Sequence, residues 1–362
     1  MASYLSFNFG IEIELLLASR TKNHKSWHSM ATELSIRLNA AGIPNHLNED
    51  SDPSLENYVE WSITREVTIP PQAGKGLWGL ELVSPILNQE TPWSTDLHQI
   101  FSVLKTSFSL TSSTHCSTHI HISTASPSLQ SSPYTLASIA KSILYFEPAL
   151  DSLFPAERSS SYWCQSNRLN PILKPLSMAQ CFEYIDAAAA CEDPFAGYIM
   201  AGVGGAASTE IVRVMNLYPA RSAYGRAHGY TEDFVHGVYK WDFSNLLPAS
   251  LTTDGGMAFG GGKQTLEFRQ APGSLRAEDV RTWVELAVSF VAGSVEIWTP
   301  SSSTSAVGDA APAVGLDPAR RVTMEDLWWV LRCGAQSTGI GDLRGVEKLF
   351  LSKGKGGRKG RK

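Results

Sequence analysis

The segment Phe9-Gly10-Ile11-Glu12-Ile13-Glu14-Leu15-Leu16-Leu17 alternates aliphatic with acidic residues and predicts a β-strand over Tyr4–Leu17. Residues i and i+2 of a strand point to the same face, so Glu12 and Glu14 share one side and the isoleucines the other. The aliphatic run at its end indicates a central strand. Burying a carboxylate there costs several kcal/mol unless a cation or a partner compensates. The segment therefore predicts a buried ionic site as well as a strand.

Two later segments repeat this two-residue spacing with other polar side chains. The pairs are His119 with His121, and Glu267 with Arg269. Each pair alternates with aliphatic or aromatic residues, which places it on one face of a predicted strand. Glu81 lies within the apolar stretch Leu80–Val83 and is a fourth candidate. A lone Glu-x-Glu pair is usually a solvated sheet surface. Three such pairs in apolar surroundings favour a shared ionic site.

The residue types in this set indicate which metal the site would take. Carboxylate oxygens with one or two imidazoles suit Mg²⁺ or Mn²⁺. A zinc site would hold more histidine or cysteine and fewer carboxylates. Magnesium in proteins usually serves phosphate groups, so the set also predicts a bound nucleotide.

The charge distribution argues against a nucleic-acid binder. The 362 residues include 30 basic and 35 acidic side chains, and six of the basic ones fall in Lys353–Lys362. The rest of the chain therefore carries 24 basic against 35 acidic side chains. Proteins that bind nucleic acid need a basic face to displace counterions from phosphates. An acidic body suits a site that collects divalent cations instead.

The cysteines and the apolar runs predict a cytoplasmic protein. The five cysteines are odd in number and show no Cys-x-x-Cys spacing, which is typical of reduced thiols. The first residues hold Glu12 and Glu14 and do not resemble a signal peptide. No stretch approaches the roughly 20 apolar residues of a spanning helix. Nuclear import through the basic tail is the alternative localisation.

Hydrophobic periodicity predicts an α+β fold, with a mostly antiparallel sheet and helices packed on one side. Further strands are expected over Val59–Val67, Leu77–Ser84, Thr118–Ser123, Val212–Tyr218, Gly237–Leu246 and Gln264–Gln270. The polar stretch Asn45–Leu55 is expected to be a loop. A helix through Leu136 and Leu144 should be interrupted or kinked at Pro148.

Composition divides the chain into four predicted parts. Residues 1–298 form a single catalytic domain, and residues 299–320 form a linker of Ser, Ala, Gly and Pro. Residues 321–351 form a C-terminal helical segment that opens with a capping box at Thr323–Asp326. Residues 352–362 form a basic, disordered tail.

The polar strands resemble those of a known fold. Phe9–Leu15 looks like the opening strand of glutamine-synthetase-like ligases, Thr118–Ser123 like their His-x-His strand, and Leu266–Arg269 like their Glu-x-Arg strand. The chain is more similar still to the fungal type of the amidoligase family, a divergent branch of these carboxylate–amine ligases. That resemblance covers about Phe7 to Trp283. Its further blocks are Glu81–Pro85, Phe146–Leu150, Leu153–Pro155 with Arg158, and Lys240–Phe243.

The resemblance implies a glutamine-synthetase-like domain that forms an amide through an acyl-phosphate, with ATP and two Mg²⁺ or Mn²⁺ ions. Its expected metal ligands are Glu12, Glu14, Glu81, His119 and Glu267. Its expected phosphate contacts are His121 and Arg269. Arg269 and Glu267 would be catalytic, because a guanidinium neutralises charge on the transferring phosphoryl group and a carboxylate takes the proton of the amine. The expected substrates are a small-molecule or peptide carboxylate and an amine, with neither membrane nor nucleic acid.

Some features depart from this pattern or leave alternatives open. The family usually has Gly where this chain has Ser117, and an Asp-x-Ser element where it has Glu66 and Thr68. Lys240 is either a phosphate contact or a surface lysine. The glycine-rich stretch Gly255–Lys263 is not a P-loop, because Gln264 stands where Ser or Thr is required. Two alternative functions are a phosphoryl transferase on the same fold and a catalytically inactive nucleotide- or metal-binding protein.

Overall fold

The computed structural model describes residues 6–50, 58–124, 129, 132–191, 206–247, 263–298 and 317–356. These residues form an α+β fold around a mixed sheet of nine strands in the order β10-β11-β7-β1-β4-β3-β2, with β5 and β6 also paired to β1. Every pairing is antiparallel except that of β2 with β3. The strands are β1 (Phe7–Ser19), β2 (Asn45–Asn48), β3 (Trp61–Thr64), β4 (Trp78–Val83), β5 (Leu87–Asn88), β6 (Phe108–Thr111), β7 (Ser117–Thr124), β10 (Trp241–Asp242) and β11 (Leu266–Pro272).

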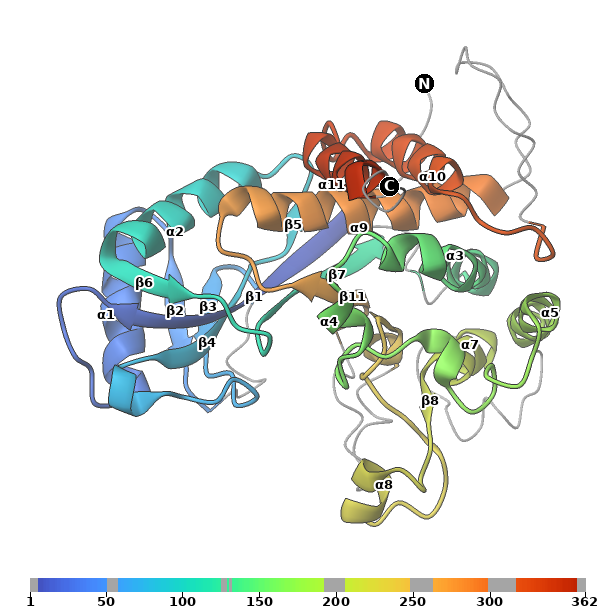
Figure 1. Cartoon of the computed structure of the whole chain (residues 1–362), viewed down its shortest axis with the longest axis horizontal. Helices are drawn as coiled ribbons and strands as arrows, with labels where there is room; N and C mark the ends of the chain where they lie inside the picture. Colours follow the sequence, from blue (N-terminus) through green and yellow to red (C-terminus); the bar gives the residue numbers. More distant parts are fainter. Residues whose placement is uncertain are drawn as a thin grey trace, which may run out of the picture.

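Helices cover the apolar face of this sheet, as the sequence predicted. The longer ones are α1 (Trp27–Ala40), α2 (Trp93–Ser107), α3 (Pro133–Asp151) and α9 (Ala277–Trp298). Ile11, Ile13 and Leu15 of β1 are almost fully buried in one core with side chains of these helices. In Figure 1, α9 runs along the sheet, and α10 (Met324–Thr338) and α11 (Arg344–Gly356) lie on its outer side. The even-numbered residues of β1 therefore face away from this helical layer.

A smaller set of elements packs beside β10 and β11. It comprises α4 (Ala156–Ser159), α5 (Met178–Ala189), α7 (Ala206–Asn216), β8 (Leu217–Tyr218), α8 (Ala223–Ala227) and β9 (Phe234–Val235). The two short strands β8 and β9 pair with each other in a separate two-stranded sheet. Figure 1 shows α8 projecting from the body of the molecule on this side.

Two predicted strands are much shorter than expected. Val212–Asn216 belongs to helix α7, and only Leu217–Tyr218 is extended. Ile211, Val214 and Met215 recur at helical spacing and are fully buried, which shows that the apolar run has a helical period. Over Gly237–Leu246, only Trp241–Asp242 pairs with the sheet.

Two further expectations are corrected. The predicted loop at Asn45–Leu55 begins with strand β2, whose polar residues are compatible with an edge position beside β3. Helix α3 continues through Pro148 to Asp151. Pro148 removes the N–H that would bond the Leu144 carbonyl, but it lies in the last turn, where only three residues of the helix follow it.

The C-terminal part of the described chain contains helices α10 and α11. Helix α11 runs to Gly356, past the predicted end at Leu351. Most of the predicted linker, residues 299–316, and the end of the basic tail, residues 357–362, lie outside the described residues. Among the helices that the structure describes, none is both long and apolar enough to cross a membrane.

Candidate functional site

Strand register brings the predicted polar residues onto one face of the sheet. Glu12 lies opposite His119 on β7, and Glu14 lies opposite Glu81 on β4. His121 lies opposite Glu267 on β11. Residues directly opposite each other in an antiparallel pair point to the same side. The two glutamates of β1 share a face, so all six side chains point away from the helices. They are called the acidic cluster below.

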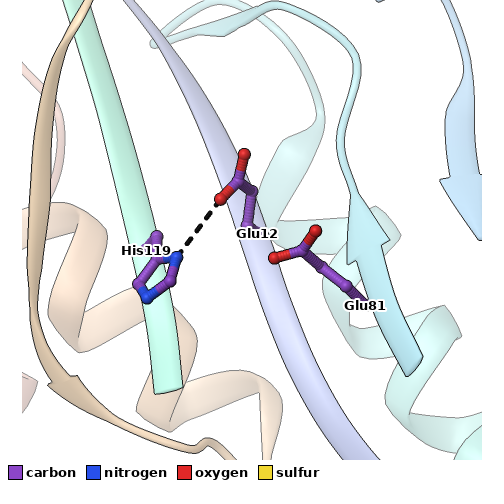
Figure 2. Close-up of side chains that lie close together, drawn as sticks. All are labelled: Glu12, Glu81 and His119. Atoms are coloured by element: carbon purple, nitrogen blue, oxygen red, sulfur yellow. Dashed lines mark hydrogen bonds and ion pairs between the residues drawn. The ribbon is translucent and has the colours of Figure 1, made fainter. Parts of the chain in front are cut away.

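Glu12 and His119 form the centre of the acidic cluster. Figure 2 shows the Glu12 carboxylate between His119 on one neighbouring strand and Glu81 on the other. His119 Nδ1 lies 3.2 Å from Glu12 Oε2 and 3.4 Å from Glu267 Oε1. Glu12 and His119 are almost fully buried, whereas Glu81 is half-buried. One ligand atom from each of Glu12, Glu81 and His119 falls within 4.8 Å of the others, which is close enough for one metal ion.

A second group with metal-ligand spacing consists of Glu12, His121 and Glu267. His121 Nε2 is buried and forms an ion pair with Glu12 Oε1 at 2.9 Å, but without the geometry of a hydrogen bond. Its other ring nitrogen, Nδ1, lies 3.0 Å from the Thr265 hydroxyl. A buried ring nitrogen without a hydrogen bond is costly, and a bound cation would satisfy it. The position of this nitrogen is the observation that best supports a metal ion in this group.

The third group adds a residue that the sequence had not placed in the site. Glu14, Glu66 and Glu81 offer ligand atoms within 4.8 Å of one another. Glu66 follows β3, and sequence analysis noted it only as a departure from the family's Asp-x-Ser element. Its position beyond the end of a strand has no periodic signal, so its approach to Glu14 could not be predicted from spacing. Three carboxylate oxygens are a ligand set that Mg²⁺ accepts.

Ser117 orients two members of the acidic cluster. Its backbone N–H and its hydroxyl donate to Glu14 Oε2, at 2.6 and 2.7 Å. Its Oγ also lies 2.8 Å from His119 Nε2. Because the hydroxyl has only one proton to donate, its oxygen accepts from His119 Nε2–H. The other ring nitrogen, Nδ1, faces Glu12 and Glu267, so a cation bound there would leave the Ser117 contact intact.

Arg269 brings a guanidinium to the same face. Its Nη1 forms an ion pair with Glu267 Oε1, and Asn245 Nδ2 donates to Glu267 Oε2 at 2.8 Å. Arg158 donates to the Arg269 carbonyl at 2.6 Å and to the Gln270 carbonyl at 3.2 Å. The Glu267–Arg269 strand is therefore held from the side by Arg158, and the guanidinium is fixed next to the acidic cluster.

The structure does not bring Lys240 to the acidic cluster. Its Nζ lies 2.8 Å from Glu147 Oε1 and 2.7 Å from Asp151 Oδ1, and only 3% of the side chain is exposed. Two carboxylates of α3 thus already neutralise this ammonium. We therefore omit Lys240 from the proposed phosphate contacts.

Lys263 reaches the acidic cluster instead. Its Nζ lies 2.8 Å from Glu12 Oε1. The sequence placed Lys263 only at the end of a glycine-rich stretch, whose residues 255–262 lie outside the described residues. Its closeness in sequence to the Glu267 strand is the one signal that could have suggested a place in the site.

Charges within the acidic cluster shift several pKa values in opposite directions. Burial raises the pKa of Glu81 well above its usual range, and the Glu12, Glu14 and Glu66 carboxylates raise it further. Burial alone would also raise the pKa of Glu12, but Lys263 and the two histidines lower it well below its usual range. Burial is likewise outweighed at Glu267, where Arg269 is the main cause of a pKa of about 2. Burial also raises the pKa of Glu14, so the cluster has two carboxylates held ionised, Glu12 and Glu267, beside two with raised pKa values, Glu81 and Glu14.

Comparison with known proteins covers part of this arrangement. Residues 6–180 match the model of a protein family described as "Putative amidoligase enzyme". The match includes the strands that carry Glu12, Glu14, Glu81, His119 and His121, whereas Glu267 and Arg269 lie beyond it. The match ends at residue 180, whereas the resemblance described above was expected to reach Trp283. No curated protein and no solved structure matches the chain.

Proposed function

We propose that the chain, whose residues 6–180 match the amidoligase family model, is a ligase that joins a carboxylic acid to an amine as an amide at the expense of ATP. The observation that carries this proposal is the convergence of the acidic cluster and Arg269 on one face of the sheet. Four carboxylates and two imidazoles suit divalent cations, and a guanidinium beside them suits a phosphate. Together they favour a site for a metal-bound nucleotide.

Nucleotide and metal would supply the activation step of this reaction. The γ-phosphoryl group of ATP is transferred to the substrate carboxylate, the amine attacks the resulting acyl-phosphate, and the products are the amide, ADP and phosphate. Divalent cations neutralise phosphate charge during the transfer. One cation would be held by Glu12, Glu81 and His119. A second would be held either by Glu12, His121 and Glu267 or by Glu14, Glu66 and Glu81.

The remaining contributions come from side chains that position and neutralise. The ion pair with Glu267 holds the Arg269 guanidinium beside the acidic cluster, where it is placed for the transferred phosphoryl group. The buried surroundings of Glu12 and His119 strengthen these electrostatic contacts, because less water screens them. The sequence suggested Glu267 as the base for the attacking amine, but its ion pair with Arg269 and its pKa of about 2 suit it better to holding the cation and the guanidinium.

The test is product analysis with the purified full-length chain. Candidate amino acids, other carboxylic acids and amines are incubated with ATP and Mg²⁺, and the products are followed by mass spectrometry and by phosphate release. A ligase gives an amide together with ADP and phosphate in equal amounts. A stable phosphorylated acid without amide would instead identify a phosphoryl transferase and overturn the proposal.

Two variants and a control link the activity to the acidic cluster. E12Q and R269K retain the shape or the charge of the side chain, and each should lower kcat/KM by roughly 100-fold or more, the loss typical of removing an electrostatic contact in a transition state. E90Q is the matched control, because Glu90 is exposed in the turn that precedes α2. Normal turnover by both E12Q and R269K would refute the roles assigned to these residues.

A further inference from the structure

Lys263 brings a flexible, positively charged side chain to the buried Glu12 carboxylate. Its Nζ lies 2.8 Å from Glu12 Oε1, and 34% of the Lys263 side chain is exposed against 10% for Glu12. Lysine carries its charge at the end of a flexible four-carbon stem. The ammonium can therefore leave Glu12 for solvent or another anion without any movement of the sheet.

The backbone next to Lys263 is fixed, which sets where this stem begins. Gln264 has a φ of +56°, a left-handed conformation uncommon for residues other than glycine. Its N–H donates to the Asn245 carbonyl at 2.9 Å. The next residue, Thr265, has its hydroxyl 3.0 Å from His121 Nδ1. These contacts hold the base of the Lys263 side chain beside the acidic cluster.

The oxygen that Lys263 contacts is also one that a metal ion needs. Glu12 Oε1 lies 2.9 Å from His121 Nε2, the buried ring nitrogen that forms no hydrogen bond. A divalent cation held by Glu12, His121 and Glu267 would take its place between these atoms. An ammonium so close to the same oxygen would repel that cation, because two positive charges would share one carboxylate.

We propose that Lys263 is the counter-ion of Glu12 in the metal-free protein, that a divalent cation displaces its ammonium, and that the displaced ammonium then contacts the phosphates of the metal-bound nucleotide. This inference rests on the metal and nucleotide site proposed above. Arg269 differs from Lys263 in this respect, because its ion pair with Glu267 and the Arg158 contact fix it in place. The site would then hold one positively charged side chain that stays in place, Arg269, and one that changes partner, Lys263.

The substitution K263M tests this exchange through two affinities that should move in opposite directions. Without nucleotide, K263M should bind Mn²⁺ about fivefold more tightly than the wild type in titration calorimetry, the effect expected from losing a partly exposed competing charge. At saturating Mn²⁺, it should bind a nonhydrolysable ATP analogue about fivefold more weakly. A merely structural role for Lys263 would weaken both affinities. K263R retains the charge and should stay closer to the wild type in both titrations.

The control variant is K105M, which removes an exposed lysine on α2 and should leave both affinities unchanged. If wild-type protein binds Mn²⁺ and K263M binds it equally or less tightly, the counter-ion role is wrong while the metal site stands. If the ATP-analogue affinity of K263M equals that of the wild type, the phosphate contact is wrong. If neither the wild type nor any variant binds Mn²⁺, the proposed metal site is wrong, and this inference is wrong with it.

Discussion

At the scale of single residues, Ser117 connects two members of the acidic cluster through one hydroxyl. Its Oγ–H donates to Glu14 Oε2, and its oxygen is in position to accept from His119 Nε2. The resemblance noted in the sequence led us to expect glycine here, and a glycine could not provide this hydrogen-bonded link. Groups that orient a metal-binding histidine commonly change metal affinity when they are removed.

The substitution S117A should weaken Mn²⁺ binding by roughly 10-fold, because partners that orient a ligating histidine contribute about that much or more. The backbone N–H of residue 117 still donates to Glu14, so the fold should persist. Titration calorimetry measures the affinity, and circular dichroism checks the fold. S109A, on the exposed side of β6, is the matched control. Equal affinities for the wild type and S117A would show that the hydroxyl does not set the His119 orientation.

Glu33 makes stability depend on pH at a site far from the acidic cluster. Its Oε2 lies 2.7 Å from His24 Nε2, and its Oε1 lies 2.6 Å from Arg37 Nη2. Burial alone would raise the pKa of Glu33, but the hydrogen bonds from His24 and Arg37 lower it from 4.5 to about 2. A carboxyl whose pKa is lower in the folded state stabilises the protein above the unfolded-state value.

We therefore expect E33Q to lower the free energy of unfolding at pH 7 by up to about 3 kcal/mol. The contribution of Glu33 is fully present above pH 4.5 and is lost as the pH falls toward 2. Urea unfolding at pH 7 and near pH 3 should thus give a large difference between wild type and E33Q at the first pH and a smaller one at the second. A difference that grows on acidification would contradict the assigned pKa direction.

At the scale of elements, α9 and α10 approach each other through glycine. A Cβ added to Gly334 of α10 would overlap the Ser289 carbonyl of α9 and come within 2.6 Å of the Gly293 nitrogen. Gly293 has the reciprocal relation with the Val330 carbonyl. Because neither helix backbone can yield without moving the core beneath it, this crossing requires the missing side chains.

The substitution G334A should lower the free energy of unfolding by roughly 1–3 kcal/mol, the usual cost of overpacking. The expected sign is informative, because alanine favours an isolated helix over glycine by nearly 1 kcal/mol. G74A is the control, since a Cβ there would meet no atom within 4 Å. Chemical denaturation of both variants gives the comparison. An unchanged or higher stability of G334A would mean that the two helices separate easily.

The elements that the sequence predicted well are those whose pattern is local. In β1, the alternation of Ile11, Glu12, Ile13 and Glu14 specifies both a strand and the faces of its side chains. The region around Trp241 is different, because side chains distant in sequence determine it. Asn167 bonds both backbone groups of Trp241, and Asn216 accepts from the Phe243 N–H. No period in residues 237–246 could reveal those partners.

The candidate site divides in the same way. Its members on strands, such as His119 and Glu267, follow from two-residue spacing and from register. Glu66 and Lys263 lie outside the strands, where position depends on loop geometry rather than on period. The partners of Lys240, which the sequence left as either a phosphate contact or a surface lysine, were hidden for a related reason, because Glu147 and Asp151 lie on a helix distant in the sequence.

At the scale of the whole molecule, the tightly packed helical side of the sheet stabilises a fold whose other face brings carboxylates close together. One face of the sheet is apolar and covered by helices, whereas the other carries the carboxylates of the acidic cluster. Burial and three neighbouring carboxylates raise the pKa of Glu81, so its ionised form destabilises the folded protein at neutral pH. Ligand sites are commonly less stable than the rest of a fold for this reason, and a bound cation would raise the free energy of unfolding again.

This arrangement predicts that E81Q stabilises the metal-free protein and weakens the response to metal. In EDTA, E81Q should unfold at a higher temperature than the wild type, with a gain of about 1–2 kcal/mol from the relieved repulsion. In Mg²⁺ at 100 times its dissociation constant, the wild type should gain about 2.7 kcal/mol, and E81Q clearly less. The order of the two proteins therefore reverses when metal is added. E90Q should follow the wild type in both conditions, because Glu90 is exposed. If E81Q is instead the less stable protein in EDTA, Glu81 is satisfied by the fold itself, and the acidic cluster has no unmet need for a cation.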